Sequence, residues 1–526
     1  MITGIIVENF KGIREREEIE LRPLTLLFGE NSAGKSTIVE ALFVLEELLL
    51  DRHHRRGKSL TRHIAQSIGS VRELVHGQDP GRSITLGVTV SLSEDDNIFG
   101  FLPINTVKFT GDSGLAAAQM PSLFCMNSLG GEEPTSLTVT VTFCEDPALS
   151  TLLISQVMIA VNGHRLVCLK ATDETHCHTL LTARVLNAFS WEVDTNHEIL
   201  SIDAQRAELP PFMVLMEQIL PSDFDPPLND EVCSLNDGPL ALSLNIIVLA
   251  TLRRIESELA RHRRIGPMRM VPPRHFRPQP QPSREDWLTG IAAWDQLGFV
   301  TDPTLDSINE WLGPDKLDTG IAVVNQTLVT LSEVMERVKL DPRDRSNLTP
   351  YKSEGNVPRE ILLRPIGTKY GGAAVSIPNL LPSQVGSGIS QIVPVVVACV
   401  SREGLLVTIA QPELHLHPRL QVKLGDLFID FVSEHDYNDK RNQLIVETHS
   451  EHLILRLLRR VRETTKRCVP EGLGLTSEDI VVYHVSQKQG RTVIRKLDID
   501  ANGQFVQPWP DDFFEIDFYE RFDDAR

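Results

Sequence analysis

The residues best suited to chemistry lie near the start of the chain, in the sequence GENSAGKST at residues 29–37. They fit the spacing Gly-x-x-x-x-Gly-Lys-Ser/Thr of a phosphate-binding loop. An apolar run, residues 24–29, precedes the loop, and a segment with helical apolar spacing, residues 38–50, follows it. Strand, glycine-rich loop and helix are the context that such a loop requires. The pattern predicts binding of a nucleoside triphosphate, and these flanks argue against a chance match.

The predicted loop supplies contacts for phosphate and for metal. Backbone amides and the N-terminus of the following helix form a site for anions. Lys35 is expected to reach the β- and γ-phosphates, and the Ser36 hydroxyl is expected to hold Mg²⁺. The predicted cofactors are therefore ATP and Mg²⁺. The predicted nucleotide-binding residues of the loop are Gly29, Glu30, Asn31, Ser32, Ala33, Gly34, Lys35, Ser36 and Thr37.

The composition is that of an ordinary globular protein with 526 residues, 41% of them hydrophobic and 23% charged. No apolar run is long enough to span a bilayer, and the N-terminus MITGIIVENFKG has no signal-peptide pattern. We therefore expect a cytoplasmic protein without membrane contact, whose seven scattered cysteines are reduced thiols. The net charge of −19 argues against a surface coated by nucleic acid, but it leaves a local basic groove open.

The two ends of the chain share a pattern that differs from the middle. Residues 1–92 carry the loop and several strands, and residues 361–526 return to strand–helix alternation. Residues 93–240 are rich in short strands and turns, and residues 241–360 are helical and Pro-rich. We predict an α/β fold in which one ATPase domain, a mixed or parallel sheet with flanking helices, is split by a long α+β insertion.

One long helix is predicted over residues 241–264, because Ile246, Ile255 and Leu259 recur at helical spacing before Gly266-Pro267. Basic residues gather at its end and in two further segments, residues 52–63 and 456–466. Two interpretations carry equal weight: solvated faces with protein contacts, or a groove for nucleic acid.

Three motifs in the last part of the chain resemble those of the ABC-class ATPases related to the overcoming-lysogenization-defect (OLD), RecF and SMC proteins. Pro412-Glu413 and Leu416-His417-Pro418 match the segment that follows the Walker B strand of that group. VGSGISQ, residues 385–391, resembles its signature loop, and ETHSEHLI, residues 447–454, resembles its switch-histidine motif. With the phosphate loop, the resemblance covers both ends of the chain and implies an ABC-type ATPase head.

This resemblance implies roles for individual residues. ATP would lie between Lys35 of one subunit and Ser387-Gly388 of another, so at least a homodimer is expected, and larger rings are compatible. The signature-loop residues implied to contact nucleotide are Gly386, Ser387, Gly388 and Ser390. The catalytic residues implied are Gln411, Glu413 and His449, the last close to the γ-phosphate.

One departure from the family pattern concerns hydrolysis. Ala410 stands where the Mg²⁺-ligating acid is expected, and Gln411 stands where a Glu usually polarises water. Alanine can neither bind Mg²⁺ nor transfer a proton. The hypothesis is an ATPase whose hydrolysis is impaired at Ala410, either by deliberate trapping of the ATP state or by natural decay.

The resemblance extends to stand-alone ATPases of the PARIS and Septu antiphage systems. It implies a sensor or scaffold that assembles around ATP and controls a separately encoded nuclease or toxin. A RecF- or SMC-like ATPase that clamps DNA in repair or recombination is the alternative, so nucleic acid remains a candidate partner. A nuclease with a site in the insertion is the weakest interpretation, because no paired-carboxylate motif stands out.

Overall fold

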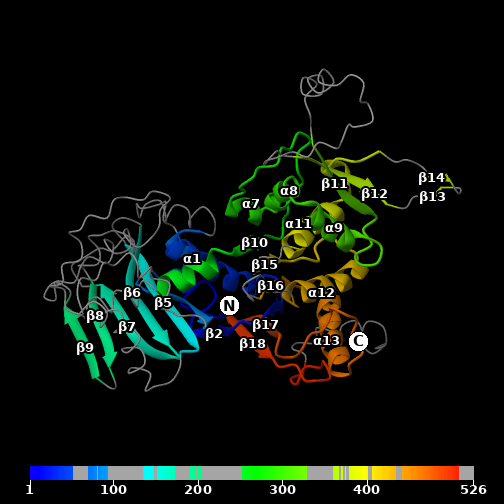
Figure 1. Cartoon of the computed structure of the whole chain (residues 1–526). Coiled ribbons are helices and arrows are strands. Elements are labelled where there is room, and N and C mark those ends of the chain that lie inside the picture. Colours follow the sequence, from blue (N-terminus) through cyan, green and yellow to red (C-terminus); the bar gives the residue numbers. More distant parts are fainter. Residues whose placement is uncertain are drawn as a thin grey trace, which may run out of the picture. The chain divides into compact units, whose positions relative to one another are not determined.

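The chain folds into two units, shown in the computed structural model of Figure 1. The first contains residues 1–21, 30–261 and 485–494, and the second contains residues 22–29, 262–484 and 495–526. The basic segment at 52–63 lies outside the described residues. The structure describes residues 1–50, 69–79, 81–92, 134–146, 151–171, 189–195, 198–203, 251–327, 359–366, 369–370, 373–374, 378–400, 405–433 and 441–508.

An eight-stranded antiparallel sheet, in the order β2-β1-β4-β5-β6-β7-β8-β9, dominates the first unit. Side chains of β4 alternate, with Ile84, Leu86 and Val88 fully buried, which is the period of two of a sheet with one packed face. The strands are β1 Ile2–Glu8, β2 Glu17–Glu20, β4 Ile84–Ser91, β5 Ser136–Asp146, β6 Thr151–Val161, β7 His164–Ala171, β8 Phe189–Thr195 and β9 Glu198–Asp203.

The strands predicted within residues 93–240 continue the sheet of the N-terminal strands. β5 pairs with the whole length of β4, from Ile84 opposite Phe143 to Ser91 opposite Ser136. Helix α1, Lys35–Leu50, packs against β1 and β4 of the same sheet. The short helix α3, Val71–Leu74, is capped by Ser70, and η1 follows at His76–Gln78.

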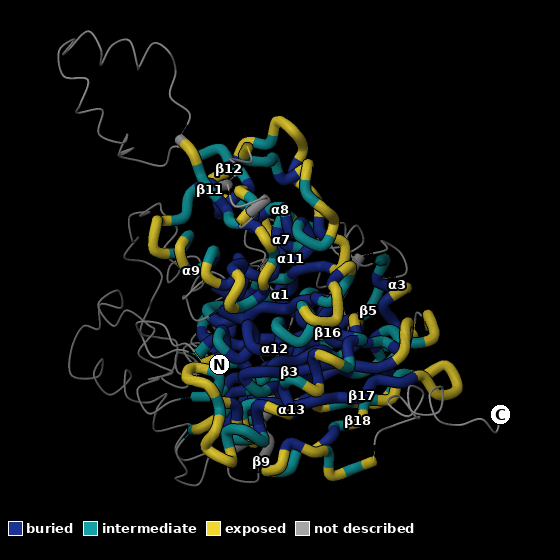
Figure 2. Tube along the Cα trace, turned by 90° about the vertical axis from the view of Figure 1, so that its right-hand side faces the viewer, coloured by how far each residue is buried: buried dark blue, intermediate teal, exposed yellow. Residues whose placement is uncertain are grey.

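A six-stranded sheet, in the order β10-β15-β16-β3-β17-β18, forms the centre of the second unit. Its first four strands are parallel. β3 and β16 are buried along their whole length (Figure 2), as expected for parallel strands covered on both faces. The strands are β3 Leu24–Gly29, β10 His262–Ile265, β15 Leu406–Ala410, β16 Gln443–Thr448, β17 Ile480–Lys488 and β18 Arg491–Leu497, the last two running partly into the first unit.

Two long helices, α11 (Ser387–Val400) and α12 (Pro418–Ser433), pack against this sheet and against each other, and a third, α13 (Glu451–Thr465), packs against α12. Helix α11 contacts β10 and β15, and helix α12 contacts β3 and β16. No helix within the described ranges is both long enough and apolar enough to cross a bilayer. The remaining elements of this unit are α7 Arg284–Leu288, α8 Ile291–Leu297, α9 Asp302–Leu312, η4 Pro382–Gln384, and the antiparallel pairs β11 Ile321–Thr327 with β12 Arg359–Pro365 and β13 Lys369–Tyr370 with β14 Ala373–Ala374.

The long helix predicted over residues 241–264 is wrong at its end. Residues 251–259 are helical, but residues 262–265 form β10, parallel to β15. Residues 262–265 form a strand because the backbone of β15 supplies hydrogen-bond partners for them. The His262 side chain adds a contact, since its Nε2 lies 3.0 Å from the Thr408 hydroxyl. Residues 241–250 lie outside the described part of the chain.

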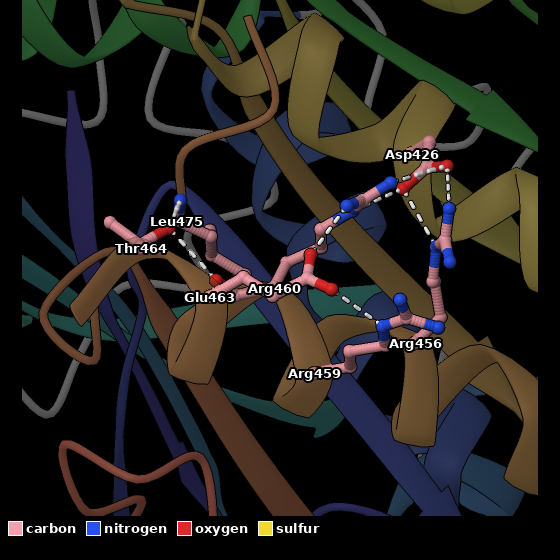
Figure 3. A network of polar contacts seen from close by, with 7 residues as sticks. All are labelled: Asp426, Arg456, Arg459, Arg460, Glu463, Thr464 and Leu475. Carbon is pink, nitrogen blue, oxygen red and sulfur yellow. Dashed lines mark hydrogen bonds and ion pairs between the residues drawn. The ribbon is translucent and has the colours of Figure 1, made fainter. Parts of the chain in front are cut away.

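Several arginines of the predicted basic segments are held by protein contacts. Arg254 is 3% exposed and pairs with Glu258, and the Arg263 guanidinium lies 4.6 Å from the centre of the Trp287 ring. On α13, Arg456 and Arg460 both bind Asp426 of α12 (Figure 3). For these residues the structure favours protein contacts over a nucleic-acid groove.

The α12–α13 contact depends on the carboxylate of Asp426. Arg456 binds its two oxygens at 2.9 and 2.5 Å, and Arg460 binds them at 2.9 and 3.2 Å (Figure 3). Burial alone would raise the pKa of Asp426, but the hydrogen bonds and charges of both arginines outweigh it and hold that pKa below its usual range. Glu463 gives Arg460 a second partner at 2.5 Å, so the cluster compensates its buried charges.

We expect Asp426→Asn to destabilise the protein by about 3 kcal/mol, because the buried Arg460 guanidinium and the half-buried Arg456 guanidinium lose a charged partner. Chemical denaturation measures the change. Asp318→Asn is the matched control: it removes a carboxylate from an exposed pair with Arg419, and it should cost less than about 1 kcal/mol.

Asp426→Asn should also change how the free energy of unfolding depends on pH at acidic pH. A depressed pKa means that Asp426 contributes stability above its unfolded pKa of about 3.9, and that this contribution is lost as pH falls through the folded pKa. Wild-type protein should therefore lose more stability than Asp426→Asn between about pH 5 and 2. Parallel acid-denaturation curves would contradict the assignment.

Candidate nucleotide-binding site

The phosphate loop has the backbone geometry of an anion site. It connects the buried end of β3 to the start of α1, and Gly29, Ser32 and Gly34 have φ values of 144°, 62° and 103°. Such left-handed positions let successive N–H groups face a common centre, where a helix N-terminus adds positive potential. The predicted strand, loop and helix are therefore confirmed as elements.

Within the loop, the side chains differ in exposure. Asn31, Ser32 and Ser36 are exposed, and Lys35 is 5% exposed, with its Nζ donating to Glu30 O at 2.6 Å. The remaining positions have structural contacts: Ala33 N donates to Glu30 O, and Thr37 N donates to Gly34 O. The residues fit a triphosphate, because a lysine and an exposed hydroxyl occur together at a helix start.

Thr492 on β18 supports the loop from the other end of the sequence. Its hydroxyl donates to Ala33 O at 3.0 Å, and its N–H donates to Gly12 O at 2.9 Å. A Cβ added at Gly34 would lie 2.4 Å from the Thr492 hydroxyl, so Gly34 is required both by its φ and by this contact. Sequence analysis did not find Thr492, because nothing near it marks a site.

The parallel strands of the second unit end in one row. Ala410 of β15 pairs with Glu447 of β16, and Thr448 pairs with Phe28 of β3. The next residues are Gln411, His449 and Gly29, so the turns after all three strands begin at the same edge of the sheet. Carboxyl ends of parallel strands are where ligands bind in α/β folds.

Position 410 is an alanine and so has no carboxylate. The backbone at residues 410 and 411 is fixed by hydrogen bonds. Gln411 has a φ of 46° and donates its N–H to Glu447 O at 2.7 Å. The Arg269 guanidinium donates to Ala410 O at 2.8 Å and to Gln411 O at 3.2 Å. The backbone at the end of β15 is therefore fixed from two sides.

Arg269 also connects β15 to α11. It donates to Gln391 O at 3.4 Å, while the Gln391 amide donates to Arg269 O at 2.8 Å. The residue is 3% exposed, and its Nε has no partner within the described structure. Burial lowers the pKa of Arg269 to about 10, and the Glu413 carboxylate opposes this shift, so the guanidinium stays charged at neutral pH.

Glu413 holds the turn that carries His449. Its Oε1 accepts the His449 N–H at 2.6 Å, and its Oε2 accepts the Thr448 hydroxyl at 2.9 Å. Burial raises the pKa of Glu413, and the hydrogen bonds from His449, its own N–H and Thr448, with the charge of Arg269, oppose the rise only in part. Ser450 then caps α13 through Leu453 N at 3.1 Å. The structure thus brings Gln411, Glu413 and His449 together at one edge.

The predicted signature loop, residues 385–391, contains exposed and buried members. Gly386 and Ser387 are exposed at the start of α11, and an added Cβ at Gly386 would meet nothing within 4 Å in the described structure. At Gly388 it would lie 3.2 Å from His415 O. Ser390 is fully buried and donates its hydroxyl to Ser387 O at 2.9 Å. In this conformation, Gly386 and Ser387 are the members that an outside molecule can reach.

No group of three His, Cys, Asp or Glu side chains is placed to hold a metal ion among the residues that the structure describes. His415 and His417 are exposed in the turn after β15. Two histidines at this i, i+2 spacing could be zinc ligands, but among the described residues no third His, Cys, Asp or Glu completes a site with them.

Replacement of Arg269 should show its role in the fold. We expect Arg269→Met to lower the free energy of unfolding by about 1–3 kcal/mol, because the carbonyls of Ala410, Gln411 and Gln391 lose a donor in a buried or part-buried setting. Arg274→Met, the same change at an exposed position of the same segment, should cost less than about 0.5 kcal/mol. Equal denaturation midpoints for the two variants would contradict this interpretation.

Comparison with known proteins agrees with this architecture. A family model described as an AAA ATPase domain matches residues 1–99 and 303–454. The first segment contains the phosphate loop, and the second contains the signature loop, β15 and β16. No curated protein sequence matches the chain.

Solved SMC heads are similar to the chain only weakly. The SMC head bound to the C-winged helix domain of ScpA has 11% identity and a TM-score of 0.39, covering 95% of this chain and 98% of that one. The SMC head domain from Thermotoga maritima has 9% identity and a TM-score of 0.36, covering 95% and 99%. The family match and the strand–loop–helix geometry show a P-loop ATPase fold with mixed sheets and flanking helices, split by an insertion as predicted.

Proposed function

We propose that the chain binds ATP with Mg²⁺ through residues 29–37 and retains it instead of hydrolysing it rapidly. The main observation behind this proposal is the pair of residues at the end of β15, Ala410 and Gln411. The phosphate loop has every residue of its motif, yet Ala410 and Gln411 have no carboxylate at the edge where the turns after β15 and β16 begin. Binding and turnover are separable, because they depend on different residues.

Bound Mg²⁺–ATP would supply a polyphosphate chain whose charge is partly neutralised by the metal. The loop amides and Lys35 would hold the phosphates, and the Ser36 hydroxyl would be a ligand of the metal. Gln411 can orient a water molecule by hydrogen bonding, but its amide cannot accept the proton of that water at neutral pH. His449 is the proposed contact to the γ-phosphate, in a turn fixed by Glu413.

A second copy of the chain is the proposed partner of the signature loop. Gly386 is exposed, its φ is not left-handed, and an added Cβ would be accommodated. The described fold therefore gives no internal reason for glycine there. Close approach of another molecule's phosphates to the Gly386–Ser387 backbone supplies one. Ser390, buried and bonded to Ser387 O, has a structural role in the start of α11.

The long-lived ATP state suits a sensor or scaffold better than a motor. We propose that ATP-linked assembly controls a separately encoded effector, a nuclease or toxin, in antiphage defence, as the resemblance to PARIS and Septu ATPases implies. The DNA-clamp alternative requires free cations. Arg456 and Arg460 are instead bound to Asp426, which favours the first reading for this face of α13.

Two variants test ATP retention. Lys35→Ala should weaken ATP binding at least about tenfold, because the lysine is the main charged contact to the phosphates. Ala410→Asp with Gln411→Glu should raise ATP turnover about 100-fold or more, since it adds a metal ligand and a general base. Nucleotide-binding titration and phosphate-release assays measure both effects. Turnover equal to that of wild type in the acid-restored variant would refute the retention hypothesis.

Effector control has its own test. Protein purified from its native host should carry a second polypeptide, and ATP should change the mass of this complex in light-scattering measurements. Lys35→Ala should abolish the ATP effect. A chain that purifies alone and binds DNA tightly in an ATP-dependent and salt-sensitive way would replace the effector proposal by the DNA clamp.

A further inference from the structure

A groove lies between α13 and the loop that follows β18, within the second unit. It encloses about 610 Å³, which is in the size range of pockets that hold ligands. Residues between Gly503 and Pro508 form one wall. The α13 wall has the spacing i, i+3, i+4 and i+7, which places its members on one face of the helix: Leu455, Leu458, Arg459 and Arg462.

The loop wall of the groove is fixed by contacts of its own. The Asp500 carboxylate accepts the N–H groups of Asn502 and Gln504, both at 2.9 Å. Gly503 has a φ of 66°, and an added Cβ would clash with Leu458 O, so glycine allows the loop backbone to pack directly against α13. The groove is therefore formed by the fold itself.

The groove combines exposed apolar surface with a positive charge. Leu455 is 48% exposed, although Leu453 and Leu457 on the same helix are fully buried. The Arg462 guanidinium has no hydrogen-bond or ion-pair partner among the described residues, whereas Arg459 pairs with Glu463 at 2.6 Å. Such a surface suits a segment that carries both aromatic side chains and carboxylates.

The sequence that follows the groove has this chemistry. Residues 509–526, WPDDFFEIDFYERFDDAR, lie outside the described part of the chain and start next to Pro508. Six of these 18 residues are aromatic, against 6% in the whole chain, and seven acidic residues with two arginines give a net charge of −5. A segment attached at the groove has an effective concentration there on the order of millimolar, so a weak intrinsic affinity is enough for docking.

We propose that residues 509–526 dock in the groove of the same chain, with aromatic side chains against Leu455 and carboxylates beside Arg462. The segment covers apolar surface that otherwise faces solvent, and while it is docked this face of α13 is closed to other proteins. The proposal is independent of ATP retention, because the residues that line the groove belong neither to the phosphate loop nor to the turns after β15 and β16.

Photo-crosslinking in the full-length protein tests this docking. Benzoylphenylalanine in place of Leu455 should be tolerated, because the leucine is already half exposed. It should crosslink to residues 509–526 of the same chain, as identified by mass spectrometry of the digested monomer. Benzoylphenylalanine in place of Val271, which is 41% exposed and lies outside the groove, is the matched control and should give no such crosslink.

A charge reversal tests the ionic part of the contact. Arg462→Glu should lower the crosslink yield from position 455 at least about fivefold, because a charged hydrogen bond is lost. Arg495→Glu reverses an exposed arginine of β18 outside the groove and should leave the yield unchanged. If Arg462→Glu does not fold, Arg462→Gln should lower the yield in the same direction.

Three results would overturn the proposal. The first is a crosslink from position 455 that never reaches residues 509–526. The second is a crosslinked dimer in place of the monomer, which would assign the groove to a second copy of the chain. The third is a yield that stays at the wild-type value in folded Arg462→Glu or Arg462→Gln, which would remove the charge pairing.

Discussion

The parallel hydrogen-bond register of β15, β16 and β3 is the constraint on which the rest of the structure depends. It joins segments from opposite ends of the sequence into one row, with Ala410, Glu447 and Leu27 side by side. A slip of one residue in any strand would turn its side chains to the other face. The turns after the strands, which carry Gln411, His449 and Gly29, start together only because this register is fixed.

Two side chains of opposite charge, the buried Arg269 and the half-buried Glu413, hold the turns at this edge. Arg269 binds carbonyl oxygens at the end of β15, and Glu413 binds an N–H and a hydroxyl at the end of β16. Each side chain satisfies backbone or side-chain groups that the sheet leaves without a ladder partner. The same two groups interact electrostatically, so a change at one strand end alters the other. The ends of β15 and β16 are therefore held by polar contacts from Arg269 and Glu413 that influence each other.

The phosphate loop, the parallel strands and the helices after them could be predicted, because local spacing and strong apolar periodicity determine them. The end of the predicted helix at 262–265 could not, since His262 and Ile265 join β15 through contacts 144 residues or more away along the chain. Arg269 and Thr492 were missed for the same reason. Each acts through backbone groups of distant segments, and a single sequence gives no signal for such contacts. The alignment of Glu447 with Ala410 likewise exists only once strand order and register are known.

The contact between Thr492 and the loop at Ala33 and Gly34 has a consequence for synthesis. A ribosome makes residue 492 long after residue 34, and a chain of 526 residues leaves it at about 5–20 residues per second. For most of that time the loop lacks its hydroxyl support and the sheet lacks its last strand. Nascent chains that have not yet reached residue 492 therefore lack the hydroxyl that contacts Ala33, and synthesis of β18 completes the set of contacts around the phosphate loop.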